Sequence, residues 1–473
     1  MERRRGAQAQ LVSALRIGEP NRLLRAVRTA VDDASLIKSI PRTTFTEILR
    51  ALDPQHFIEP YKRIHKDMSP ATVSLIEAKP IRVLFAEFVS VIGRLAQTRR
   101  EAGWSLGIAD YTLLLKCAEA VGNGTAAETL WHDMKRDGIA PDTPCYNHYI
   151  SARCWSGASD PSERHHLRVT PHHLKMRNAP HPPKGFAGYK IGEGGIKQEV
   201  GSVLQEMVDR GVVGDETTYS TLITAMAREG DVSGIKAVLK QVWQLDIDEE
   251  APGPPPPLAA TSPLHPTSTL LYAIAHGLGS NNDIPLALKA VDTLSRAYDV
   301  AIPIEIWETL LEWTFVLSIP RRKSRRHDGT ATGLLPLQSV QSLWTTMTSA
   351  PYHIRPSMAM YNVYIKNLFL RGMPRLAEEQ MQEGLRLYLR GRSRPRVGLG
   401  EGAESGPARL ERRRNALYIR RWVRLLLGTR AALRSEAYNW ERRAVPDLIG
   451  RWHRFLPKQV AYRSSGGRVG FGV

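Results

Sequence analysis

Asp110–Asn147, DYTLLLKCAEAVGNGTAAETLWHDMKRDGIAPDTPCYN, contains one complete helix–turn–helix unit and the start of the next. Four apolar residues recur at i, i+3, i+4 and i+7, the spacing of one helical face: Tyr111, Leu114, Leu115 and Ala118. The Gly-Asn-Gly run at 122–124 predicts the end of this helix. A second apolar face follows at Ala127, Leu130, Trp131 and Met134. Gly138 and Pro141 predict where the second helix ends.

This helix pair recurs along the chain. Tyr146 follows Tyr111 by 35 residues, and an offset of 108 residues reproduces the first apolar face as Tyr219, Leu222, Ile223 and Met226. Trp307 and Tyr361 open further first helices. A helix pair repeated at a fixed period predicts an all-α fold, an α-solenoid of about six pairs. The register of the fourth pair stays open, because Leu271 and Tyr272 both fit its opening position.

Composition narrows the class of protein. The chain has 473 residues, 42% of them hydrophobic, which favours a folded protein over a disordered one. No apolar run is long enough for a transmembrane helix. The three cysteines, Cys117, Cys145 and Cys154, are too few for a disulfide scaffold and indicate a reducing compartment.

The positive charge is concentrated at the C-terminal end. The whole chain carries a net charge of +18, and residues 386–473 hold 20 Arg and one Lys against five Glu and one Asp, a net of +15. A basic region of this kind favours polyanions, with nucleic acid first and anionic membrane second. The alternative is a solvated, Arg-rich surface without a ligand.

The chain divides into five predicted segments. Residues 1–40 are basic and acid-poor, which predicts a mitochondrial targeting segment or, alternatively, an exposed basic helix. Residues 41–107 read as a degenerate helical cap, and residues 409–473 as a basic helical tail. The solenoid covers 108–392, with insertions at 160–195, 251–267 and 319–337, and 393–408 form a linker. The first insertion is predicted to be a long exposed loop, and the second to be stiff and extended because it is rich in proline.

The opening and closing residues of the units resemble a known family. Units open with Tyr111-Thr112, Tyr146-Asn147, Tyr219-Ser220 and Tyr361-Asn362, and two close with GIAPD (138–142) and GVVGD (211–215). This pattern resembles the pentatricopeptide repeat family, and its period of 35 distinguishes it from tetratricopeptide repeats. The resemblance covers about 108–392. The long insertions are similar to those of divergent fungal mitochondrial members.

The resemblance implies binding of single-stranded RNA, one base per repeat. In the family, the residue after the opening Tyr and the last residue of the unit contact the base edge. Applied to this sequence, the family pattern gives Thr112 with Asp142, which is similar to the pair that favours guanine. It also gives Asn147 with Asp215, which is similar to the pair that favours uracil. The later pairs depart from the family pattern: Ser220 with Glu250, Glu308 with Ser357, and Asn362 with Arg392. Each position has a structural alternative, because small polar residues also cap helices.

The tail offers a second RNA contact. Arg420, Arg421 and Arg424 suit phosphate binding, and Trp422, Tyr438, Trp440 and Trp452 lie among the arginines as in surfaces that stack bases. An amphipathic helix that packs its aromatic residues inward gives the same pattern.

Catalytic and metal motifs are weak. A zinc site would draw on Cys145, Cys154 and the histidines at 148, 165, 166, 172, 173 and 181, but the Cys spacing is wide, and buried core cysteines with a His-rich loop explain it better. The glycines at 192–195 follow no strand, so they do not form a phosphate loop. We therefore expect no enzyme, no metal and no cofactor.

Together, these patterns predict an RNA-binding gene-expression factor of the mitochondrial matrix. It would bind single-stranded mRNA or rRNA and act in RNA stability, processing or translation. The first alternative is a protein–protein scaffold associated with the mitochondrial ribosome or its assembly. A second alternative is peripheral association with the inner membrane through 409–456.

Overall fold

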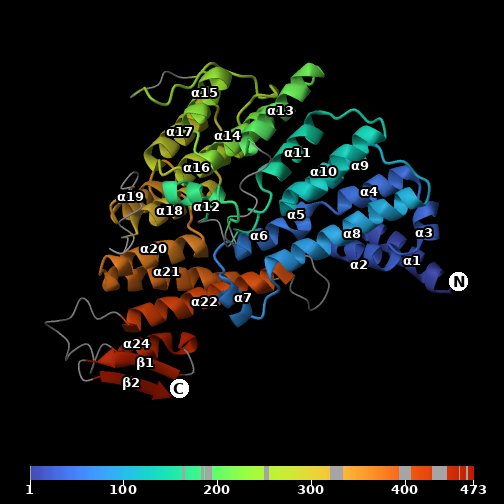
Figure 1. Cartoon of the computed structure of the whole chain (residues 1–473). Coiled ribbons are helices and arrows are strands. Elements are labelled where there is room, and N and C mark those ends of the chain that lie inside the picture. Colours follow the sequence, from blue (N-terminus) through green and yellow to red (C-terminus); the bar gives the residue numbers. More distant parts are fainter. Residues whose placement is uncertain are drawn as a thin grey trace. The chain divides into compact units, whose positions relative to one another are not determined.

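The computed structural model describes residues 2–161, 166–182, 186, 194–249, 255–319, 334–393, 406–428, 445–456, 459–464 and 467–472. These residues form two compact units, one up to residue 302 and one from residue 303 onward (Figure 1). Nearly all the regular structure is helical, so the predicted α-solenoid of helix pairs is confirmed. No described helix combines the length and the apolarity needed to cross a membrane.

Unit 1 consists of seventeen described helices. In chain order they are α1 (Glu2–Ile17), α2 (Pro20–Ala30), α3 (Ala34–Ser39), α4 (Arg42–Ala51), α5 (Pro54–Phe57), α6 (Glu59–His65), α7 (Pro70–Leu75), α8 (Ile81–Glu101), α9 (Ile108–Val121), α10 (Gly124–Arg136), α11 (Thr143–Cys154), α12 (Pro171–Arg177), α13 (Ile196–Asp209), α14 (Glu216–Glu229), α15 (Val232–Trp243), α16 (Ser268–Ser280) and α17 (Ile284–Ala297). The first helices α9, α11, α14 and α16 pack side by side in that order.

Unit 2 contains helices followed by a small hairpin. Its elements are α18 (Ile304–Ser318), α19 (Ser339–Thr348), α20 (Met358–Leu370), α21 (Pro374–Ser393), α22 (Gly406–Gly428), α24 (Val445–Trp452) and the antiparallel strands β1 (Gln459–Ser464) and β2 (Gly467–Gly472). The hairpin was not anticipated in the tail, which was predicted to be helical. Helix α22 packs on both α20 and α21, so it takes the place of the next first helix.

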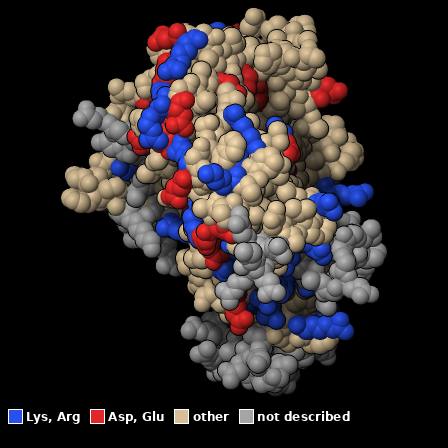
Figure 2. Space-filling model, turned by 90° about the vertical axis from the view of Figure 1, so that its right-hand side faces the viewer, with Lys and Arg blue, Asp and Glu red and all other residues tan. Residues whose placement is uncertain are grey.

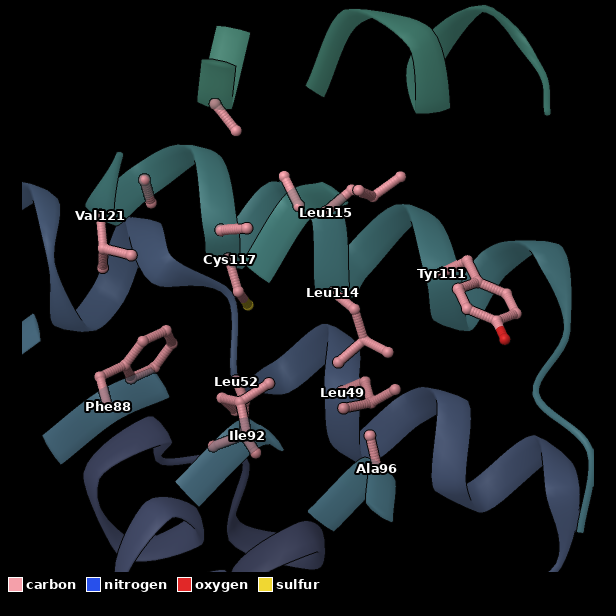
Figure 3. Packing of buried hydrophobic residues seen from close by; sticks show 14 of the residues in the cluster. Leu49, Leu52, Phe88, Ile92, Ala96, Tyr111, Leu114, Leu115, Cys117 and Val121 are labelled. Atoms are coloured by element: carbon pink, nitrogen blue, oxygen red, sulfur yellow. The ribbon is translucent and has the colours of Figure 1, made fainter. Parts of the chain in front are cut away.

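The core of unit 1 follows the predicted apolar faces. Leu49 of α4 and Leu52 directly after it pack with residues of two later helices (Figure 3). These are Phe88, Ile92 and Ala96 of α8 and Leu114 and Cys117 of α9. Each fully buried Leu or Phe contributes roughly 1.5–3 kcal/mol of transfer free energy. The turn at 122–124 forms as predicted. Gly122 ends α9 with φ of 59°, and Asn123 caps α10 by accepting the backbone N–H of Ala126.

Part of the segment 160–195, predicted to be an exposed loop, packs against unit 1, since Leu167, Arg168, Thr170 and Arg177 are buried. Arg177 is buried and donates to the carbonyl of Arg228 at 2.8 Å, in the last turn of α14. The backbone N–H of Val169 donates to the carbonyl of Ser280 at 2.8 Å, where α16 ends. Helix ends leave carbonyls without partners, and this segment supplies the donors. The sequence did not predict this role, because a segment rich in His, Pro and Lys is typical of an exposed loop.

The Pro-rich segment 251–267 is also packed where it is described. Trp243 donates its indole N–H to the carbonyl of Leu264 at 2.9 Å, and Tyr298 donates its hydroxyl to the carbonyl of Pro256 at 3.0 Å. Thr267 then caps α16. The segment therefore connects α15 to α16 along the surface of unit 1.

Candidate nucleic-acid interface

The candidate site is defined by a position on each first helix. We call the fifth residue after each N-cap the column residue. The N-caps of α9, α11, α14, α16, α18 and α20 are Gly107, Asp142, Asp215, Thr267, Pro303 and Ser357. The column residues are therefore Thr112, Asn147, Ser220 and Tyr272 in unit 1, and Glu308 and Asn362 in unit 2. The residue before each column residue lies in the core or against it, which turns the column residue about 100° away.

Thr112 and Asp142 meet at a shared neighbour. The Thr112 hydroxyl donates to the carbonyl of Ile108 at 2.8 Å and lies 3.2 Å from the Cys145 sulfur. Asp142 accepts the backbone N–H of Cys145 at 3.0 Å, so it is the N-cap of α11. Both side chains are half-buried. Both residues of this predicted pair thus lie at the start of α11. Asp142 also has the capping role that the sequence left open as an alternative.

Asn147 and Asp215 are in direct contact. The Asn147 amide donates to Asp215 Oδ1 at 2.9 Å, and its oxygen accepts the hydroxyl of Thr218 at 2.7 Å. Asp215 also accepts the backbone N–H of Thr218 at 2.9 Å, the N-cap bond of α14. The carboxylate therefore fixes the orientation of the amide. One amide N–H of Asn147 is left beyond these bonds, on a side chain that is 5% exposed.

Ser220 faces a different partner from the one predicted. Its hydroxyl lies 3.4 Å from Glu216 Oε1, and that oxygen also accepts the Thr267 hydroxyl at 3.0 Å and the backbone N–H of Leu270 at 2.7 Å. Burial raises the pKa of Glu216, against the opposing effect of these hydrogen bonds. Glu250, the predicted partner of Ser220, lies outside the described residues. Thr267 holds the position that Asp142 and Asp215 hold in the earlier pairs.

The register left open in the fourth pair is resolved by this alignment. Leu271 is fully buried and takes the place of the opening Tyr. Tyr272 is the column residue and is 38% exposed. Leu271, and not Tyr272, is therefore the equivalent of Trp307. The 35-residue spacing from Tyr272 to Trp307 does not connect equivalent positions.

In unit 2, both column residues are bonded within the protein. The hydroxyl of Ser357, the N-cap of α20, donates to Glu308 at 2.5 Å. The Asn362 oxygen accepts the indole N–H of Trp422 at 3.2 Å, and Asn362 is only 1% exposed. Arg392, the predicted partner of Asn362, lies within α21 and not at a following N-cap. This arrangement leaves Asn362 inaccessible to a base.

Helix α22 exposes most of its arginines and buries its aromatic residues, although the buried Arg414 lies 5.3 Å from the centre of the Tyr418 ring. Arg409, Arg413, Arg420 and Arg424 are exposed and recur at intervals of four and seven, which places them on one face. Trp422 and Tyr418 are buried, so the inward-packing interpretation holds for these rings. Arg421 is half-buried. Trp452 is also buried, whereas Tyr438 and Trp440 lie outside the described residues.

Charges in unit 1 are largely paired. Lys116 contacts Asp53 at 2.5 Å and Lys135 contacts Glu206 at 2.8 Å, and Arg153 bridges Glu128 and Glu199. On the face drawn in Figure 2, positive and negative side chains lie next to one another in several places. These cations are therefore already paired with carboxylates of the protein.

The Cys/His segment does not form a metal site among the residues that can be placed. Cys145 and Cys154 are fully buried, and burial raises the pKa of the Cys154 thiol to about 12. His148 contacts Glu119 at 2.5 Å. Within the described ranges, no group of His, Cys, Asp and Glu could hold a metal ion. His165 falls outside those ranges.

Sequence reasoning missed three aromatic residues near the column. Tyr272 stacks on His276 with ring centroids 5.9 Å apart, and His276 meets the edge of Trp155 at 5.6 Å. Aligning the helices from their N-caps, rather than from their opening aromatic residue, would have placed Tyr272 in the column.

Comparison with known proteins agrees with this architecture. Residues 94–153 match the family described as pentatricopeptide repeat domain, and residues 216–328 match the family described as mitochondrial ATPase expression. The chain is 21% identical over 316 residues to "Pentatricopeptide repeat-containing protein 6, mitochondrial" of Schizosaccharomyces pombe, covering 66% of this chain and 64% of that relative.

Solved structures with similarity include the pentatricopeptide repeat protein PPR10 from maize. The free protein aligns with a TM-score of 0.41 at 12% identity, over 96% of this chain and 54% of that one. PPR10 in complex with an 18-nt psaJ RNA element aligns with a TM-score of 0.38 at 13% identity, over 92% and 55%. Residues 94–153 are thus similar to the pentatricopeptide repeat domain, and about two thirds of the chain is similar at low identity to a mitochondrial pentatricopeptide repeat-containing protein.

Proposed function

We propose that this chain is a non-enzymatic gene-expression factor of the mitochondrial matrix that binds single-stranded RNA. The bases would lie along the column of unit 1, with Thr112 and Asn147 as the readers, Asp142 and Asp215 as their positioning carboxylates, and Ser220 beside them. The arginines of α22, including Arg420, Arg421 and Arg424, would contact phosphates. Asn362 has no part in this proposal, because Trp422 covers it.

The contact between Asn147 and Asp215 carries the proposal. A carboxylate at 2.9 Å fixes the rotation of the amide, and a fixed amide presents a defined donor to a base edge. To cap α14, Asp215 needs only to accept the backbone N–H of Thr218. Its hydrogen bond from the amide of Asn147 goes beyond what capping requires. The family descriptions support a mitochondrial setting and suggest a transcript for an ATPase subunit as one target.

The test is crosslinking and sequencing of RNA bound in cells. The intact chain is compared with a Thr112→Ala/Asn147→Ala variant and with an Asn362→Ala variant as the matched column control. We expect a narrow set of organellar transcript sites that is lost in the double variant and kept in the control. The proposal fails if the intact chain yields no reproducible RNA sites.

A protein–protein scaffold on the mitochondrial ribosome is the second candidate, favoured by a specific observation. Thr112, Asn147 and Ser220 already have hydrogen-bonding partners within the protein, and Lys116, Lys135 and Arg153 are paired with carboxylates. A scaffold would give broad ribosomal RNA crosslinks that survive the double variant and disappear when residues 409–473 are removed.

A further inference from the structure

Tyr272 differs from the other column residues of unit 1 in both chemistry and exposure. Thr112, Asn147 and Ser220 are small, polar and bonded to the start of a helix, whereas Tyr272 is an aromatic ring that is 38% exposed. Its neighbours Leu270, Leu271, Ala273 and Ile274 are buried, so α16 packs normally around it. The position therefore offers a flat apolar face where its counterparts offer polar atoms.

The ring of Tyr272 is supported from below. His276 lies one turn further along α16, with its ring 29° from parallel to that of Tyr272 and 5.9 Å away. The edge of Trp155, at the end of α11, meets His276 at 5.6 Å and 71°. The guanidinium of Arg228 lies 5.7 Å from the centre of the Trp155 ring, and donates to the carbonyl of Cys154. Trp155, itself contacted by Arg228, thus packs against the ring beneath Tyr272.

The electrostatics of this support suit a stacked aromatic ring. Burial, with Lys66 and Arg228 nearby, lowers the pKa of His276 to about 3, so its imidazole is neutral at physiological pH. A neutral imidazole beside Tyr272 adds no positive charge to this stack of rings. Aromatic platforms of this kind bind single-stranded nucleic acid by stacking, which tolerates any base because every base has a π-face.

We propose that Tyr272, supported by His276 and Trp155, stacks on one base of the bound RNA without selecting its identity. The fourth pair would then hold the strand while the first two pairs read it. The inference rests on the proposed RNA-binding function. The inference assigns base stacking to the fourth helix pair. The small polar column residues of the earlier pairs have no aromatic ring with which to stack.

The experiment begins with a randomised 14-nucleotide RNA pool carrying 4-thiouridine, selected on the full chain. The best-enriched RNA is then used to measure dissociation constants by fluorescence anisotropy for Tyr272→Ala, Tyr272→Phe and Val208→Ala. Val208 is 67% exposed on the second helix α13 and serves as the matched surface control. We expect about ten-fold weaker binding for the Ala variant, as loss of one stacked base predicts, and a change within about two-fold for Phe and for Val208→Ala.

Two further readouts separate stacking from other roles. Photocrosslinking of the selected RNA to the unmodified chain should yield a crosslinked peptide containing Tyr272, a result that no folding defect can produce. The dependence of the affinity on salt concentration should be the same in the Ala variant, because stacking releases no counterions. Replacing the base at the crosslinked position by each of the other three should change the affinity by less than about three-fold.

The outcomes distinguish the inference from the function on which it rests. If the pool yields no bound RNA, the proposed function and the inference both fail. If RNA binds and Tyr272→Ala binds equally well, the function stands and the inference is overturned. A Phe variant as weak as the Ala variant would assign the contact to the hydroxyl, and a strong preference for one base at the crosslink would make Tyr272 a reader. Either result overturns stacking without selection.

Discussion

Asn147 of unit 1 and Asn362 of unit 2 are both asparagines at equivalent column positions, yet their surroundings differ. Asn147 of α11 is held by Asp215 and Thr218, both in the first turn of α14. Asn362 of α20 is held by Trp422, in the middle of α22, and the indole lies over it. Both amides are buried, but polar groups at the start of the next first helix hold the Asn147 amide, whereas an aromatic ring holds the Asn362 amide. The residue type at a column position therefore does not decide what that position can bind, because the neighbouring helix contributes as much.

The same difference shows how unit 2 ends its row of first helices. Trp422 lies so close to Gly384 of α21 that an added Cβ would be 2.9 Å from the ring. Together with Tyr418, Ile419 and Val423 it forms the buried face of α22. The exposed arginines 409, 413, 420 and 424 lie on the opposite side of this helix. A segment that reads as a basic tail in the sequence is therefore also a helix that covers the apolar side of the last pair, as a solenoid requires.

The largest effect should come from removing the covering ring. Trp422→Ala should lower the free energy of unfolding of unit 2 by about 3–5 kcal/mol, because a fully buried Trp leaves a cavity between α20, α21 and α22. Leu425→Ala, on the same helix but 40% exposed, is the control and should cost less than about 1 kcal/mol. Chemical denaturation followed by circular dichroism measures both. Similar losses in the two variants would mean that α22 does not cover α20 as described.

The second prediction concerns the bond between the two side chains. Asn362→Ala should cost about 1–3 kcal/mol in the same denaturation assay, because the buried indole N–H of Trp422 loses its acceptor. In an Asn362→Ala/Trp422→Phe double variant, the loss should be smaller than the sum of the single losses, since neither residue then leaves an unpaired donor. Additive losses would show that the 3.2 Å contact contributes nothing.

The sequence predicted the helix pairs well and the surroundings of the column poorly, for a physical reason. Apolar spacing and turn residues act locally, so the first and second helices of the clear pairs were found from residues such as Tyr111 and Gly122. The column depends on contacts between helices up to 71 residues apart, such as Asn147 with Thr218. The spacing of Asn147 and Asp215 suggested a pair only through family resemblance. Nothing local indicated that Trp422 would cover Asn362 or that Arg177 would cap α14.

A third prediction concerns the pH dependence of stability in unit 1. His276 is kept neutral in folded unit 1, with a pKa of about 3, whereas an unfolded His titrates near 6.5. Because the unfolded state takes up the proton first, stability is fully present above pH 6.5 and falls as the pH decreases toward 3. We expect wild type to lose about 1 kcal/mol more than His276→Phe between pH 7.5 and 5.5. Thermal unfolding at the two pH values tests this, and equal losses would contradict it.

The smallest expected effect concerns phosphate binding by unit 2. It tests whether the arginines of α22 contact the RNA backbone although Asn362 does not contact a base. Arg420 and Arg424 are exposed on the face of α22 opposite the covered column, and a phosphate contact by each would add about 0.7 to the salt slope of single-strand binding. Arg420→Gln/Arg424→Gln should therefore reduce the slope of log Kd against log salt by about 1.4 and weaken binding at low salt to all sequences alike. The matched control is Arg16→Gln/Arg22→Gln, which removes two exposed arginines from unit 1. If the α22 variant instead changed which sequences are bound, the arginines would be acting on bases. The division between a reading column in unit 1 and a phosphate-binding helix in unit 2 would then be wrong.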